Sequence, residues 1–159
     1  YNKGILNNGS HMLDLLHLLV GPMDIVKVGK PIQDFFPSDP TIPVWLEGPQ
    51  GVPVHLVCGY AEDYAIFELQ MVFSQGMLIM EDGGLFWRER RAVNSETFKG
   101  YRMLEAGARR TGEYPRAMLN AVDNIYRAIN HGESLASTGE SALAAQRLCE
   151  QVKQQAIAL

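Results

Sequence analysis

The chain has 159 residues, of which 47% are hydrophobic and 20% charged, with a formal net charge of −4. These values are typical of one soluble globular domain, long enough to bury a hydrophobic core. The mild negative charge argues against nucleic acid or an anionic membrane as partner, and no hydrophobic run is long enough to span a bilayer.

Residues 10–20 form the first predicted helix. Leucine and methionine recur along it at helical spacing, which predicts a helix that is buried on almost all sides. Gly21-Pro22 should end it, because glycine releases the backbone and proline cannot continue the helix.

The residues at the start of this helix are the best candidates for chemistry. Asn7 or Asn8 is placed to cap the first turn. If the chain is already helical at Asn7, then Asn7, His11 and Asp14 share one face, since they follow at spacings of four and three. An imidazole between an amide and a carboxylate is suited to proton transfer. His17, six residues after His11, falls on a different face and is expected to be a bystander.

From Met23 the hydrophobic period changes to two, which is typical of strands. Short glycine-rich connections favour hairpins and a largely antiparallel sheet. Trp45, Val72 and Trp87 place hydrophobic surface on the outer face, so we expect a second sheet to pack there. The charged run 88–91 is expected to be a solvated strand end. The predicted strands are residues 25–28, 41–47, 52–59, 65–73, 76–81, 85–93 and 101–105.

Two helices close the chain. Pro115 suits the first turn of one, and Ser137 or Thr138 caps the other. The first has a hydrophobic stripe at Met118, Val122, Ile125 and Ile129. The inner face of the second comprises Ser141, Ala145, Leu148, Val152 and Ala156. The predicted fold class is α+β: an open, largely antiparallel sheet of about six or seven strands with helices on one face. Residues 1–159 are expected to be a single domain.

The sequence contains no motif of a nucleophilic active site or of a zinc site. G-x-S-x-G is absent, and neither Cys58 nor Cys149 has a histidine nearby in the sequence. Both cysteines have hydrophobic neighbours and no metal-type spacing, so we expect buried free thiols and a cytoplasmic protein. No zinc-binding pattern joins the four histidines, His11, His17, His55 and His131.

Two segments resemble a known family. The run from Gly4 to Pro22, Gly-Ile-Leu-Asn-Asn-Gly-Ser-His-Met-Leu-Asp-Leu-Leu-His-Leu-Leu-Val-Gly-Pro, is similar to the opening of the substrate-side domain of the glucose–fructose oxidoreductase / inositol dehydrogenase (Gfo/Idh/MocA) family. That family carries Asp-x-Gly-x-His-x-x-Asp before a leucine-rich helix, and Gly9, His11 and Asp14 match it. Ser137-Thr-Gly-Glu-Ser-Ala-Leu resembles the start of the family's last helix. The two segments bracket nearly the whole chain in the expected order.

The departures from the family pattern are informative. Asn7 stands where many members have aspartate. Asparagine at this place resembles the branch of the family that acts on nucleotide-linked or other modified sugars. The family's nucleotide-binding half has no counterpart, because no strand here is followed by G-x-G-x-x-G. Lys30-Pro31 resembles the family's Glu-Lys-Pro but follows the histidine instead of preceding it. We therefore expect this chain to be a fragment of a longer protein, and we expect that the fragment itself binds neither NAD nor NADP.

The residues Gly9-Ser-His-Met12 are also the string that a common tag-cleavage vector leaves behind. Such a scar normally begins a chain, whereas here eight residues precede it.

The resemblance implies roles for the candidate residues. His11 is the implied proton donor or acceptor, Asn7 binds a substrate hydroxyl, and Asp14 either binds substrate, orients His11 or anchors the helix. The implied whole enzyme oxidises a sugar, nucleotide-sugar or cyclitol hydroxyl, or reduces the ketone, with NAD or NADP, and oligomerises through its sheet.

Three hypotheses remain open. The chain is the substrate-binding and oligomerising part of such an enzyme, a stand-alone sugar- or partner-binding domain, or an unrelated acid–base enzyme. The third predicts a deep pocket around His11, whereas the first predicts that His11 lies on an open surface.

Overall fold

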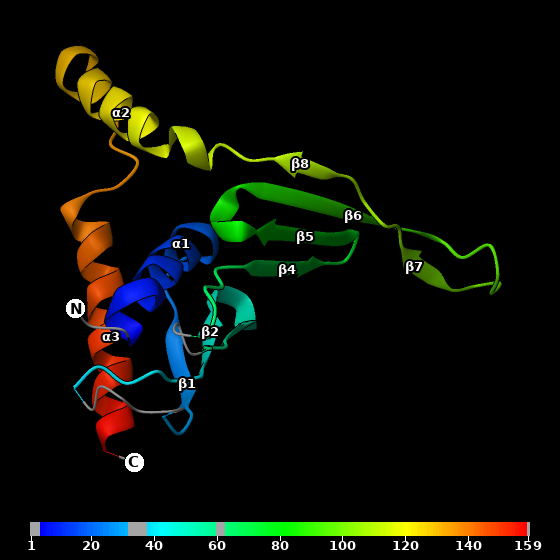
Figure 1. Ribbon diagram of the computed structural model, residues 1–159, viewed down its shortest axis with the longest axis horizontal. Helices are drawn as coiled ribbons and strands as arrows, with labels where there is room; N and C mark the ends of the chain where they lie inside the picture. The colour runs from blue at the N-terminus through cyan, green and yellow to red at the C-terminus, as the bar shows by residue number, and fades with distance from the viewer. Residues whose placement is uncertain (1–3, 32–37, 60–62, 159) are drawn as a thin grey trace. The chain divides into compact units, whose positions relative to one another are not determined.

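The computed structural model describes residues 4–31, 38–59 and 63–158. Two compact units divide the chain: the first comprises residues 1–65 and 136–159, and the second residues 66–135. The α+β class and the antiparallel pairing are confirmed (Figure 1). Eight described strands form a three-stranded and a five-stranded sheet, where one sheet of six or seven strands was expected. The organisation of the chain as one domain stays a prediction.

The first unit combines the three-stranded sheet, ordered β1-β2-β3, with two helices that pack on each other. The second of these helices also contacts β1. Its elements are η1 (Ile5–Gly9), α1 (Ser10–Val20), β1 (Asp24–Val28), β2 (Val44–Gly48), η2 (Pro49–Gly51), β3 (Val52–Leu56) and α3 (Gly139–Ile157). Most of the buried hydrophobic side chains belong to this unit, with Leu13, Ile42 and Val152 fully enclosed. The core that the composition predicts therefore lies here.

Helix α1 has the predicted bounds. Gly21 follows it with a φ of +100°, a conformation that glycine adopts at little cost. Burial is less complete than predicted: Leu13 is buried, whereas Leu18 is 72% exposed. At the start of α3, the Thr138 hydroxyl accepts a hydrogen bond from the Ser141 N–H and caps the helix as predicted.

The second unit contains the five-stranded sheet and one long helix. Its strands run β4-β5-β6-β7, and β8 also pairs with β6. The elements are β4 (Leu69–Phe73), β5 (Gly76–Glu81), η3 (Asp82–Gly84), β6 (Phe86–Asn94), β7 (Arg102–Leu104), β8 (Arg109–Thr111), η4 (Tyr114–Arg116) and α2 (Ala117–His131). Met80 is the one hydrophobic side chain that is buried in the described part of this unit. Hydrophobic surface therefore remains exposed on its sheet and on α2.

The charged run 88–91 is not a solvated strand end. It lies in the middle of β6, between β5 on one side and the chain leading from β7 to β8 on the other. Its charges are paired: Arg88 bonds Glu81 at 3.0 Å, and Arg91 bonds Glu89 at 2.8 Å. The charges are tolerated there because each arginine finds a carboxylate or a carbonyl oxygen.

Among the described residues, no helix has both the length and the hydrophobicity needed to cross a bilayer.

Candidate functional site

The turn η1 sets the position of the candidate residues. It is a π-helical turn whose backbone leaves helical geometry at Asn7 (φ −90°, ψ −111°), and the regular helix begins only at Ser10. Asn7 therefore does not stand one α-helical turn before His11, as a continuous helix would require. Neither asparagine caps α1: Gly9 occupies the cap position, and the Ser10 hydroxyl bonds the Asn7 carbonyl oxygen at 2.7 Å.

A buried aspartate that the sequence analysis did not single out fixes this turn. Asp39 is 1% exposed, and its carboxylate accepts the main-chain N–H groups of Gly4 at 3.1 Å and Leu6 at 3.0 Å. A Cβ atom on Gly4 would lie only 1.7 Å from the carbonyl oxygen of Asp39. Glycine is therefore required at this position for the close approach of the two segments.

The three predicted site residues lie at the start of the first helix. His11 is exposed, whereas Asn7 and Asp14 are half-buried. His11 and Asp14 lie three residues apart in regular helix, so their side chains are neighbours on one side of α1. Neither of the two cavities described next has His11 in its lining. The roles of all three residues stay predictions.

Asp14 instead lines a cavity of about 240 Å³ between α1 and the start of α3, which we call the α1–α3 cavity. Its lining residues are Asp14, His17, Leu18, Ala136, Ser137 and Ser141. Within residues 4–31, 38–59 and 63–158, the side chains of Asp14 and His17 make no hydrogen bond or ion pair. A carboxylate, an imidazole and serine hydroxyls beside a leucine suit a neutral molecule that has several hydroxyl groups.

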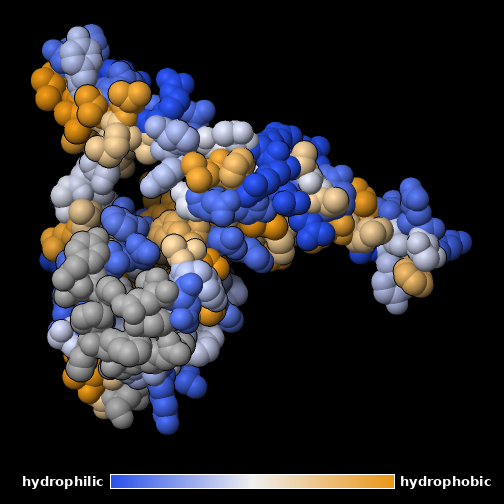
Figure 2. Space-filling view, in the orientation of Figure 1, coloured by the Kyte–Doolittle hydropathy of each residue, from blue (hydrophilic) through white to orange (hydrophobic). Residues whose placement is uncertain are grey.

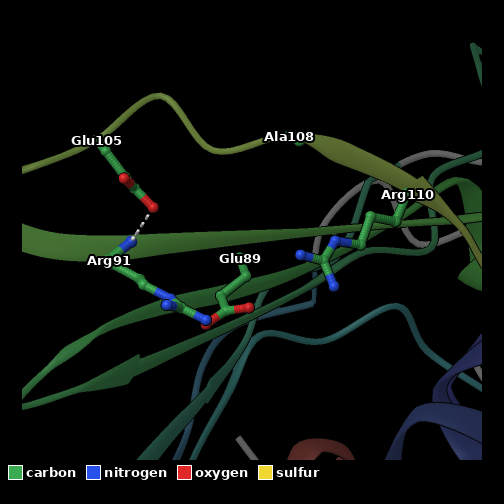
Figure 3. A pocket seen from close by; sticks show the side chains of 5 residues that line it. All are labelled: Glu89, Arg91, Glu105, Ala108 and Arg110. Carbon is green, nitrogen blue, oxygen red and sulfur yellow. Dashed lines mark hydrogen bonds and ion pairs between the residues drawn. The ribbon is translucent and has the colours of Figure 1, made fainter.

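A second cavity, of about 290 Å³, lies on the five-stranded sheet. Figure 3 shows its side chains, which come from β6, β8 and the segment between β7 and β8. Its lining residues are Glu89, Arg91, Glu105, Ala108 and Arg110. Two carboxylates balance two guanidinium groups, and Arg91 already bonds Glu89 at 2.8 Å. The balance of charge gives an anion no net attraction, so this cavity is the weaker candidate.

The ion pairs of this sheet change the acidity of its carboxyl groups. Hydrogen bonds from Arg109 and Arg88 hold the pKa of Glu81 below its ordinary value. The Arg91 guanidinium lowers the pKa of Glu89 in the same way. Both carboxylates are held ionised, as structural partners of arginine, and neither is poised to donate a proton near neutral pH.

Metal ligands do not gather in the described part of the chain, where no three histidine, cysteine, aspartate or glutamate side chains could hold an ion together. The two cysteines are free there: Cys149 is buried and Cys58 partly so. Burial raises the pKa of the Cys149 thiol to about 11, which makes it a poor nucleophile.

Sequence reasoning missed two residues near the site. His17 was expected to be a bystander, yet it lines the cavity with Asp14, because its position in the next turn places it beside the start of α3. Asp39 lies outside every predicted helix and strand, and nothing in its local pattern reveals a partner 33 residues away. Serine, aspartate and proline in succession were its only signal, and they are equally typical of an exposed turn.

Known proteins were compared with the sequence and with the fold. No family model matches the sequence, and neither does any curated protein. The fold, however, is similar to that of several solved structures over nearly all of this chain, and three of them are described next.

The first is UDP-N-acetylglucosamine 3-dehydrogenase GnnA from Acidithiobacillus ferrooxidans, at 16% identity and a TM-score of 0.64, covering 99% of this chain and 52% of that one. The second is a protein of Bacteroides fragilis assigned as an oxidoreductase, at 18% identity and a TM-score of 0.66, covering 98% and 50%. The third is YvaA from Bacillus subtilis, likewise assigned as an oxidoreductase, at 15% identity and a TM-score of 0.66, covering 98% and 51%. The chain spans about half the length of each of these proteins, and at these identities the likeness establishes the fold.

Proposed function

We propose that this chain is the substrate-binding and oligomerising part of an NAD- or NADP-dependent oxidoreductase of the Gfo/Idh/MocA type. Its substrate is the hydroxyl or ketone of a sugar, nucleotide-sugar or cyclitol. The observation that carries the proposal is the fold: 98–99% of the chain superposes on about half of a UDP-N-acetylglucosamine 3-dehydrogenase and of two proteins assigned as oxidoreductases. The histidine motif at the start of α1 supports the same conclusion.

The exposed side of α1 supports this proposal independently. Leu18 lies two helical turns after His11, so both side chains project from the same side of the helix. Leu18 is 72% and the adjacent Leu19 is 48% exposed. Hydrophobic side chains that lie open beside a titratable group are typical of a surface that an adjoining domain covers.

The residues of this chain do not fit the nicotinamide dinucleotide itself. A dinucleotide needs donors for its two phosphates, usually at a glycine-rich turn that begins a helix. The α1–α3 cavity contains a carboxylate and no lysine or arginine, and the cavity on β6 has as many carboxylates as arginines. We propose that a nucleotide-binding part outside this sequence holds the cofactor.

The chain's own residues manage the proton and the substrate hydroxyls. His11 takes the proton from the reacting hydroxyl during oxidation and returns it during reduction, since an imidazole accepts a proton when neutral and donates one when protonated. Asn7 hydrogen-bonds a neighbouring hydroxyl without adding charge. Asp14, beside His11 and in the wall of the α1–α3 cavity, accepts a hydrogen bond from a further hydroxyl.

The oligomerising role rests on the five-stranded sheet. Val72 and Phe73 of β4 are 76% and 59% exposed, and only Met80 of this unit's described hydrophobic residues is buried. A sheet with so little core of its own is stabilised when a second copy covers it.

The test uses the intact protein from its source cells. Its mass is measured, and its turnover is followed by nicotinamide absorbance with a panel of sugars, nucleotide-sugars and cyclitols. His11→Gln in that protein should lower kcat by about 10²- to 10⁴-fold, the usual contribution of a general acid–base group. His55→Gln, on the exposed side of β3, is the matched control.

Turnover that is unchanged by His11→Gln would refute the role of His11. An intact protein no longer than this chain, without nicotinamide-dependent turnover, would refute the oxidoreductase proposal. It would instead favour a stand-alone sugar- or partner-binding domain.

A further inference from the structure

The described residues that line the α1–α3 cavity all belong to the first unit. Three of them lie in α1, and the other three lie at or just before the start of α3. In Figure 2, hydrophilic and hydrophobic residues occur together over α1 and the start of α3, whereas hydrophilic residues predominate over β6 and β8. Hydrogen-bonding groups beside a hydrophobic contact are typical of a site that binds a small molecule.

Most polar groups of this cavity have no partner within the described chain. Among residues 4–31, 38–59 and 63–158, the side chains of Asp14, His17 and Ser137 make no hydrogen bond or ion pair. The Ser141 hydroxyl instead bonds Thr138 and belongs to the cap of α3. A carboxylate accepts hydrogen bonds, a hydroxyl donates and accepts, and a neutral imidazole donates at one nitrogen and accepts at the other. Together they complement the hydroxyl groups of a ligand.

The lining disfavours a phosphate. It contains the Asp14 carboxylate and no lysine or arginine, although phosphate recognition relies on such cations or on open main-chain N–H groups. The first turn of α3 does not supply these groups freely, because the Ser141 N–H is bonded to the Thr138 hydroxyl and Glu140 already lies in that turn. An uncharged, hydroxylated group is therefore the best complement.

The size of the cavity limits how much of a ligand it holds. Its volume of about 240 Å³ lies below the roughly 300–1,000 Å³ of sites that enclose a whole drug-sized molecule. The cavity therefore suits one ring of a larger molecule, and it is too small for a nucleotide.

The cavity continues from the side of α1 that carries the candidate catalytic histidine. His11, Asp14 and Leu18 follow at intervals of three and four, so all three project from one side of the helix. Asp14 and Leu18 both line the cavity. At a rise of about 1.5 Å per residue, they lie about 4.5 Å and about 10 Å beyond His11 along the helix axis. A molecule that reacts at His11 and extends along α1 thus enters the cavity with its next group.

On the basis of the proposed function, which places the reacting hydroxyl at His11, we propose that the substrate is an uncharged glycoside of at least two rings. One ring reacts at His11, and a second, hydroxylated ring attached to it occupies the α1–α3 cavity. The side chains of Asp14, His17 and Ser137 bind its hydroxyl groups, and Leu18 contacts its C–H groups. Within the proposed range of substrates, this site favours a disaccharide or a glycosylated cyclitol over a nucleotide-sugar.

The first experiment measures binding to the full chain without cofactor. Amide ¹H–¹⁵N NMR follows His17, Ser137 and Ser141 during titration with maltose, glucose 1-phosphate and UDP-glucose, which share a glucose ring and differ in the group attached to it. Lactose, galactose 1-phosphate and UDP-galactose form the matching galactose series. A disaccharide should give saturable shifts at these amides, and the phosphorylated probes should bind there about tenfold more weakly or less, because their charge meets a carboxylate.

Two results of this titration would overturn the proposal. One is the absence of shifts at these amides with both disaccharides. The other is binding of the phosphorylated probes at these amides as tightly as the disaccharides.

The second experiment identifies the residues that recognise the second ring. His17→Leu and Ser137→Ala should each weaken disaccharide binding about three- to tenfold, the usual loss for one hydrogen bond. His55→Leu makes the first of these changes at an exposed position of β3 that lines neither cavity, and it should leave binding unchanged. In the intact protein, the two cavity variants should raise KM for a two-ring substrate and leave kcat and KM for its one-ring counterpart unchanged.

The kinetic result separates this proposal from the proposed function. Nicotinamide-dependent turnover in which both variants affect one-ring and two-ring substrates equally, or affect neither, overturns the second-ring site and leaves the oxidoreductase proposal intact. Disaccharide shifts at His17 and Ser137 in a chain whose intact form has no such turnover would refute the oxidoreductase proposal and support sugar binding by the cavity.

Discussion

The Oδ1 atom of Asp39 lies 3.0 Å from the main-chain nitrogen of Leu6, although 33 residues separate them in the chain. Its second oxygen accepts the N–H of Gly4 at 3.1 Å, so one buried carboxylate orders the turn that leads into α1. The position of His11 at the start of that helix depends on this turn. A structural aspartate therefore orders the turn that precedes the candidate catalytic residue.

Replacing Asp39 by alanine should destabilise the chain. The change leaves two partly buried N–H groups without an acceptor, which costs about 1–3 kcal/mol for each such group. The measurement is urea unfolding followed by circular dichroism, with Asp24→Asn, an exposed position in β1, as the control. A loss smaller than about 0.5 kcal/mol, the usual range of surface substitutions, would show that water replaces the carboxylate.

Where local signals are strong, the sequence predicts the fold well. Residues 10–20 were predicted as a helix, and α1 spans Ser10–Val20, because a hydrophobic stripe and Gly21 together define its length. Thr138 was one of two predicted caps of α3 and forms the hydrogen bond to Ser141. These features depend on neighbours within one helical turn, which a sequence displays directly.

The predictions that failed depend on distant residues. The turn before α1 is held by Asp39, and no pattern around Asn7 or Asn8 reveals that partner. The short strand β8, Arg109–Thr111, was not predicted, because three polar residues have no alternation. Ion pairs with Glu81 hold it in place, and such pairs become visible only once the strands are aligned.

The candidate site was predictable only in part. His11 and Asp14 were placed on one side of a helix by their spacing, and the structure has them in regular helix at the same spacing. The cavity beside Asp14 is formed together with the start of α3, which lies more than 120 residues later in the chain. The sequence therefore could not show that Ser137 and His17 line the same cavity. Spacing along one helix is local information, whereas a cavity between two helices is tertiary.

Arg109 should hold β8 against β6. Its guanidinium bonds Glu81 and Asp82, each at 2.6 Å, and its Cζ atom lies 3.6 Å from the centre of the Phe86 ring. Arg109→Ala should therefore speed hydrogen exchange at the Gly112 amide, which donates to the Leu85 carbonyl oxygen at 2.7 Å.

The control for this prediction is the Ala92 amide on the other edge of β6, which donates to the Gln75 carbonyl oxygen. Its exchange rate should not change in Arg109→Ala. Equal acceleration of both amides would mean that the whole sheet opens, and an unchanged rate at Gly112 would mean that backbone pairing alone holds β8.

Glu81 should titrate below its ordinary pKa of 4.5 in the folded chain, chiefly because of the hydrogen bond from Arg109 and next because of Arg88. A lowered pKa in the folded state means that the ionised carboxylate stabilises the fold above pH 4.5. This contribution is lost as the pH falls through the folded pKa. Carboxyl ¹³C NMR measures the midpoint, which Arg109→Ala should raise more than Arg88→Ala. The reverse order, or a midpoint at or above 4.5 in the wild type, would contradict the arrangement of these ion pairs.

Cys149 should resist alkylation while the chain is folded. Its side chain is fully buried, and burial raises its pKa to about 11, so at pH 8 only about one thiol in a thousand is ionised. Cys58 lies in an intermediate environment and, despite a raised pKa, should react first. Iodoacetamide labelling at pH 8, followed by mass spectrometry, should add one group to the native chain and two in urea. Labelling of Cys149 in the native chain as fast as in urea would show that α3 separates from the elements packed against it, η1, α1 and β1, on the timescale of the reaction.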